Sequence, residues 1–235
     1  MTEIAQRESN RWRWLSRSVL AATLMALAAA PGAQAAPDET QFSVTAGSLA
    51  FQANLNVPAL PGLTLDGNAQ TLNAQMANWS AEDATGTGGG WNVTVQGDGT
   101  AGKSAVFKEY CTDGTITNGC STAVSGGPGP GYVTTSPKTL AANSLTLSST
   151  GAAFTGLTGT TGTAPTHSCS PACNVDTATA VKVAAAAADA GMGTWQADSY
   201  GASSLALSAP TTVKAIGTGN KVYRVDLTWT LNSGP

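Results

Sequence analysis

Residues 223–231 read Tyr223-Arg224-Val225-Asp226-Leu227-Thr228-Trp229-Thr230-Leu231, and every odd-numbered position in this stretch is apolar. The even-numbered positions hold arginine, aspartate and two threonines. Successive side chains of a β-strand point to opposite faces, so this alternation predicts a strand with one buried face. Trp229 and Leu231 then share the buried face, and Thr230 points the other way.

The same pattern occurs earlier, in Trp91-Asn92-Val93-Thr94-Val95-Gln96. Trp91, Val93 and Val95 fall on one side of the predicted strand, and the two amides and the threonine on the other. The tripeptides Trp91-Asn92-Val93 and Trp229-Thr230-Leu231 are therefore interpreted as one motif used twice.

Further alternating runs bounded by turn residues predict strands, and the full set is 41–53, 91–96, 144–148, 204–208 and 221–231. We expect an all-β chain folded as a single antiparallel β-sandwich or barrel-like domain. Residues 97–137 and 151–175 are predicted to be two long loops, each pinned by a disulfide. The alanine-rich run 181–190 is ambiguous between strand and helix, and we expect one short helix there.

Residues 1–35 have the features of a secretory signal peptide. Four arginines precede an apolar run at 19–30, and Ala33-Gln34-Ala35 offers small residues for cleavage. The apolar run is shorter than the roughly 20 residues that cross a membrane, and no second run follows, so we expect no membrane span in the mature chain. The remaining residues, 36–235, form the predicted domain.

Residues 36–235 carry seven Lys or Arg and twelve Asp or Glu, a net charge of −5. This acidic balance argues against nucleic acid as a partner. The polar surface must be built mainly from Thr, Ser, Asn and Gly, which is typical of an exported protein and predicts weak ionic interactions.

The four cysteines follow the signal peptide, and an oxidising compartment favours disulfides. Three pairings are possible, and sequence proximity favours Cys111–Cys120 with Cys169–Cys173. The alternative is a metal site formed by His167, Cys169 and Cys173, which lacks a convincing fourth donor. We therefore expect no metal and no cofactor.

Two apparent catalytic motifs are rejected. Residues 97–104 match the phosphate-loop pattern G-x-x-x-x-G-K-[ST], but no helix of useful length can follow before Cys111, so we expect no nucleotide. A Ser-His-Asp triad is improbable with His167 as the single histidine, and the adjacent Glu82 and Asp83 would point to opposite faces of a strand. These observations favour a non-enzymatic role.

The tryptophans divide into two groups. Trp91 and Trp229 lie on apolar strand faces and are predicted to be core residues. Trp79 and Trp195 lie beside glycine-rich or polar segments, and we interpret them as candidates for exposed aromatics that stack on sugar rings.

The chain resembles the WxL-domain family of surface proteins of Gram-positive bacteria. Residues 78–95 resemble the first tryptophan block of the family and 223–235 its C-terminal block, with weaker similarity at 191–195 and 205–210. The first motif ends in Val93 where the family has leucine, and the cysteine-bearing loops depart from the family pattern.

This resemblance implies a domain that attaches non-covalently to peptidoglycan after secretion, often beside a membrane-anchored companion protein. Trp91, Asn92, Val93, Trp229, Thr230 and Leu231 would be the binding motifs. The alternative is an exported structural or adhesive subunit of a surface assembly, with no affinity for glycan of its own.

Overall fold

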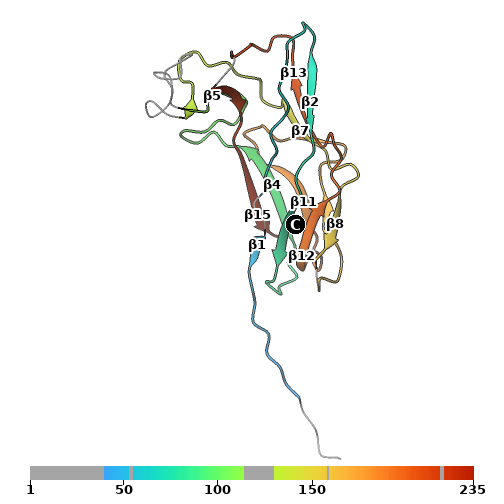
Figure 1. Ribbon diagram of the computed structural model, residues 1–235. Helices are drawn as coiled ribbons and strands as arrows, with labels where there is room; N and C mark the ends of the chain where they lie inside the picture. Colours follow the sequence, from blue (N-terminus) through green and yellow to red (C-terminus); the bar gives the residue numbers. More distant parts are fainter. Residues whose placement is uncertain (1–39, 53–54, 114–129, 158, 218–219) are drawn as a thin grey trace, which may run out of the picture. The chain divides into compact units, whose positions relative to one another are not determined.

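The computed structural model describes residues 40–52, 55–113, 130–157, 159–217 and 220–235. The chain divides into two units, Met1–Val44 and Thr45–Pro235, and all strands belong to the second. The described residues contain no helix, and therefore no helix that is long and apolar enough to span a membrane. The prediction of an all-β chain with antiparallel sheets is confirmed (Figure 1).

Within the described residues, fifteen strands form four antiparallel sheets. The first sheet has the order β1-β3-β12-β8 and the second β10-β7-β13-β2, while the third is β15-β4-β11-β9 and the fourth β14-β5-β6. In chain order the strands are β1 (Leu49–Phe51), β2 (Gln70–Ala74), β3 (Trp79–Asp83), β4 (Trp91–Gly97), β5 (Lys108–Cys111), β6 (Gly131–Tyr132), β7 (Leu145–Leu147), β8 (Ala153–Gly156), β9 (Thr166–His167), β10 (Cys173–Asn174), β11 (Val181–Ala186), β12 (Gly193–Asp198), β13 (Leu205–Ala209), β14 (Lys221–Arg224) and β15 (Leu227–Ser233).

The two predicted tryptophan strands are neighbours. β15 pairs with β4 along its whole length, with Leu231 opposite Val93 and Trp229 opposite Val95. The inner side chains of β4 are fully buried, and the alternation seen in the sequence appears directly as alternating burial along this strand. The period-2 pattern therefore predicted the strand and the buried face of β4 correctly.

Aromatic side chains join the first and third sheets. Phe154 on β8 lies edge-on to Trp79 of its own sheet, at 5.6 Å between ring centroids, and to Trp91 of β4, at 6.2 Å. Edge-to-face packing at these distances adds to the stabilisation from apolar burial. Trp79 and Trp91 are buried in the core, and Phe154 is partly buried against them.

Five sequence predictions about elements are wrong. Within the described residues, the predicted strand 41–53 is a strand only at β1, and the predicted loop 97–137 contains β5 and β6. Residues 181–190 hold no helix: β11 pairs with β4 on one side and β9 on the other, because strand pairing outweighs the weak helix propensity of alanine. The predicted loop 151–175 contains β8, β9 and β10. The predicted strand 221–231 is interrupted at residues 225–226, so that β14 and β15 belong to different sheets.

One of the two predicted disulfides is present among the described residues. Cys169 and Cys173 are bonded, and Cys169 is fully buried. The predicted Cys111–Cys120 disulfide lies partly outside the described residues, because Cys120 belongs to the undescribed segment 114–129.

Candidate functional site

The paired tryptophan motifs create a polar face on the third sheet. Asn92 lies opposite Asn232, Thr94 opposite Thr230 and Gln96 opposite Thr228. All six side chains are partly or fully exposed, whereas their neighbours Trp91, Val93 and Val95 are buried. We call these six residues the polar face.

Hydrogen bonds order the amide end of the polar face. Asn232 Nδ2 donates to Asn92 Oδ1 at 3.1 Å, and Asn92 Nδ2 donates to the Gly234 carbonyl oxygen at 2.7 Å. Thr94 and Thr230 form the centre of the face, where their hydroxyls are available to a ligand. The six side chains are uncharged hydroxyls and amides, a donor and acceptor set that suits the hydroxyl and acetamido groups of a glycan. The exposed Lys182 of β11 lies opposite Thr94 and is the neighbouring charge on this side of the sheet.

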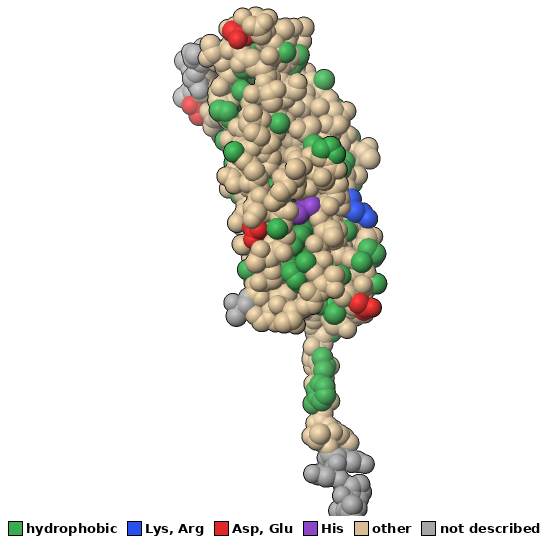
Figure 2. Space-filling view, turned by 90° about the vertical axis from the view of Figure 1, so that its right-hand side faces the viewer, with side chains coloured by type: hydrophobic (Ala, Val, Ile, Leu, Met, Phe, Trp, Pro, Cys, Tyr) green, Lys and Arg blue, Asp and Glu red, His purple; other side chains and the backbone are tan. Residues whose placement is uncertain are grey.

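Charged side chains are also few on the side of the molecule shown in Figure 2. This view agrees with a composition in which only 11% of residues are charged. Association with another polymer through such a surface depends on hydrogen bonding and packing more than on ion pairs.

The tryptophans of the two motifs differ in their surroundings. Trp91 is 0% exposed, and its indole Nε1 donates to the Gly191 carbonyl oxygen at 3.0 Å. A Cβ at Gly191 would lie 2.7 Å from this nitrogen, so only glycine permits the contact. Trp229 is half-buried, and its Nε1 is shielded from solvent without a hydrogen-bond partner in the described part of the chain.

The prediction that Trp79 and Trp195 are exposed stacking aromatics is wrong. Trp79 is 2% exposed and donates from Nε1 to the Tyr200 hydroxyl at 3.0 Å, while Trp195 is 6% exposed and donates to the Met192 carbonyl oxygen. Both lie on the paired central strands β3 and β12, so the neighbouring glycines mark strand ends and not exposed turns. Burial also raises the pKa of Tyr200 to about 12.

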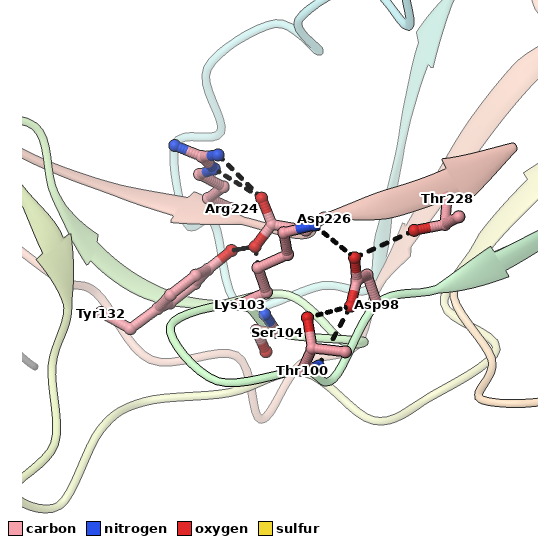
Figure 3. Close-up of polar contacts among 8 residues, drawn as sticks. All are labelled: Asp98, Thr100, Lys103, Ser104, Tyr132, Arg224, Asp226 and Thr228. Carbon is pink, nitrogen blue, oxygen red and sulfur yellow. Dashed lines mark hydrogen bonds and ion pairs between the residues drawn. The ribbon is translucent and has the colours of Figure 1, made fainter.

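Two aspartates organise the loop that resembles a phosphate loop (Figure 3). Asp98 accepts hydrogen bonds from Thr100, from Lys103 Nζ at 2.5 Å and from the Thr228 hydroxyl. Asp226 accepts from the Tyr132 hydroxyl at 2.6 Å.

Asp226 also accepts from the Ser104 backbone N–H and from two guanidinium nitrogens of Arg224. Both carboxylates are therefore fully engaged by internal donors. This arrangement fixes the loop against the β14–β15 junction and leaves Lys103 bound to Asp98. The described residues after Ser104 lead into β5 and form no helix, as the rejection of this motif required.

Acid should weaken this network. The hydrogen bonds from Lys103 and Thr100 hold the pKa of Asp98 well below its ordinary value of 3.8. The folded state then binds fewer protons than the unfolded state, so the stabilisation is present above about pH 5 and is lost as the pH falls below about 4. We expect the thermal midpoint to fall between about pH 5 and pH 2 and the Asp98→Asn variant to show a shallower slope. Equal slopes for the two proteins would contradict this prediction.

The alternative metal site is not formed. The sulfurs of Cys169 and Cys173 are bonded to each other, so neither offers a thiolate. His167 stacks on Phe154 at 4.4 Å between ring centroids, and burial lowers its pKa. Within the described ranges no cluster of metal-ligating side chains occurs.

Sequence reasoning did not find an apolar groove of about 1250 Å³ between the second sheet and the β14–β15 segment. Its floor includes Leu145, Leu205 and Leu207, and Trp229 lies in its wall. We call this feature the apolar groove. Its lining comes from separate regions of the chain, so no local pattern could reveal it.

Searches with this chain against models of protein families, curated proteins and solved structures found no match.

Proposed function

We propose that this chain is a secreted, non-enzymatic surface protein that attaches non-covalently to the peptidoglycan of a Gram-positive cell wall through a WxL-like domain. The observation that carries the proposal is the pairing of the two tryptophan motifs in β4 and β15. This pairing places the polar residues of both motifs on one face. Trp91 packs on the opposite, buried side of the sheet and does not contact the ligand.

The polar face supplies the contact in this proposal. Thr94 and Thr230 lie directly opposite each other, at the separation of a cross-strand pair. Their hydroxyls donate to and accept from glycan hydroxyl or acetamido groups. A membrane-anchored companion protein, which the family resemblance implies, would bind elsewhere on the surface.

Co-sedimentation with purified peptidoglycan tests the proposal. We expect the mature chain to sediment with the wall and to be released by denaturant without wall digestion, with little dependence on salt. The Thr94→Val/Thr230→Val variant keeps the side-chain shape but removes both hydroxyls, so we expect a drop in affinity of about tenfold or more.

A matched control uses the cross-strand pair Thr71 and Ser208 of β2 and β13, both of which are exposed. Thr71→Val/Ser208→Ala should leave sedimentation unchanged. Equal binding by the Thr94/Thr230 variant would reject the polar face as the contact. A folded wild-type chain that does not sediment would reject wall binding.

The second candidate is a structural or adhesive subunit of a surface assembly. Phe42 and Val44 favour it, because they are 90% and 80% exposed. Exposed apolar side chains at strand spacing mark a segment that pairs with another protein surface.

A further inference from the structure

The apolar groove is bordered by the ends of three sheets. β2, β14 and β15 are each the outermost strand of their sheets, and each contributes side chains to the groove. An edge strand presents backbone N–H and C=O groups that a further strand can bind. The groove therefore combines an apolar floor with open strand edges, a combination that suits a peptide strand.

Residues 55–65 line one side of the groove without completing these sheets. They include Pro58 and Pro61, and they make no backbone-to-backbone hydrogen bond to another described residue, although the Thr64 carbonyl accepts one from the Gln70 side chain. Proline cannot donate to a ladder, so Pro58 and Pro61 make this segment a poor partner for the edge strands. The Nε1 atom of Trp229, in the groove wall, also has no described partner.

The chain itself contains a segment with matching chemistry. Its sequence is Asp38-Glu39-Thr40-Gln41-Phe42-Ser43-Val44-Thr45-Ala46, in which Phe42, Val44 and Ala46 recur at every second position. A strand of this segment would present all three on one face. We call residues 38–46 the donor segment.

Charge also matches the donor segment to the groove. Lys103, Lys214, Lys221 and Arg224 line the groove. These are four of the seven basic residues in 36–235. Lys103, Lys221 and Arg224 are paired with Asp98, Glu109 and Asp226, so Lys214 is the lining cation without an ion pair among the described residues. The donor segment begins with two acidic residues, which can pair with Lys214 at the groove rim.

We propose that the donor segment of one copy binds as a strand in the apolar groove of a second copy, with Phe42 and Val44 inserted against the groove floor. The donor backbone extends an open sheet edge, as in other cases of strand addition. This inference is independent of peptidoglycan binding and gives the assembly-subunit alternative a specific mechanism.

The location of β1 favours assembly between copies. The donor segment leads directly into β1, and Figure 1 shows β1 toward the opposite end of the Thr45–Pro235 unit from β2, β5 and β13. A contact that uses different surfaces on the two partners generates rings if the rotation closes and open chains if it does not. Donor binding therefore generates chains or rings of subunits.

The mass of the mature chain in solution tests the proposal. We expect light scattering after size-exclusion chromatography to show species that grow with concentration. Phe42→Ser/Val44→Ser should be monomeric at the same concentrations, because it loses the inserted side chains while its folded unit is unchanged. Oligomers that persist in this variant would overturn the proposal, as would a monomeric wild type.

Peptide binding to the monomeric variant tests the groove directly. A synthetic peptide of residues 38–47 should bind it and shift its tryptophan emission to the blue, because Trp79, Trp91 and Trp195 are already buried and Trp229 lines the groove. The peptide carrying the two serines should not bind. No shift with the native peptide would overturn the proposal.

A rim substitution supplies a matched comparison. Val222 on β14 lines the groove and is 41% exposed, and Met192, outside the groove, is 40% exposed. Val222→Glu should raise the peptide Kd at least about tenfold by removing an apolar contact and repelling Asp38 and Glu39, whereas Met192→Glu should not. Equal binding by both variants would overturn the groove assignment. A lipid that copurifies with the protein, detected by mass spectrometry, and that the native peptide does not displace would also overturn it.

Discussion

Replacing Trp91 by alanine is expected to lower the free energy of unfolding by about 3–5 kcal/mol. The side chain is fully buried, contacts Phe154 edge-on and donates a hydrogen bond to the Gly191 carbonyl oxygen. Alanine removes these contacts, leaves a cavity between two sheets and leaves the carbonyl without its donor. Because a domain is stable by only about 5–15 kcal/mol, wall sedimentation should be lost together with folding.

Urea unfolding followed by fluorescence and circular dichroism measures this loss. Trp91→Phe is the matched control, because it keeps an aromatic ring in the core and removes the indole N–H, and we expect it to cost about 1–2 kcal/mol. Trp229→Ala should also cost less than Trp91→Ala, since Trp229 is half-buried and its Nε1 has no described partner. A Trp91→Ala protein as stable as the wild type would contradict the central position of this residue.

The β4–β15 pair shows how much of this fold could be predicted from the sequence. The strand character of both motifs followed from alternation, and Cys169–Cys173 followed from spacing. These features depend on neighbouring residues, so a local pattern contains them. The polar face depends additionally on the register that sets Thr94 opposite Thr230.

Trp79 and Trp195 show where local patterns mislead. Their neighbouring glycines suggested exposed turns, yet the two strands pair with each other and bury both indoles. A closer count of alternation at Trp195 and Ala197, both buried, would have predicted an inner strand face. For the β11 alanines the balance between helix and strand is decided by pairing with β4, which no local propensity records.

The tryptophan motifs and the apolar groove meet at Trp229. This residue belongs to the second motif through the sequence and to the groove wall through the fold. Its strand therefore connects the polar face proposed to contact the wall with the groove proposed to bind a neighbouring copy. A surface protein that does both would be held to the wall at several points along a chain of subunits, which increases its avidity.

Asp176 lies in the core, and sequence reasoning gave it no role. It is 0% exposed, and its two carboxylate oxygens accept hydrogen bonds from the backbone N–H groups of Ser144 at 2.9 Å and Leu145 at 3.0 Å. These bonds fix the start of β7, while the Leu145 carbonyl accepts from Val175. Burial raises the pKa of Asp176, so the folded state binds more protons and ionisation of this carboxyl opposes folding.

We expect Asp176→Ala to lower the free energy of unfolding by about 2–5 kcal/mol, because two backbone N–H groups would lose their acceptors at about 1–3 kcal/mol each. Removing the buried carboxylate charge offsets part of this loss of stability. Asp176→Asn keeps one acceptor oxygen and the side-chain volume, so it should cost less than alanine. Urea titrations near neutral pH, with hydrogen exchange at Ser144 and Leu145, measure both effects. Unchanged protection of these amides in the alanine variant would show that other groups hold the start of β7.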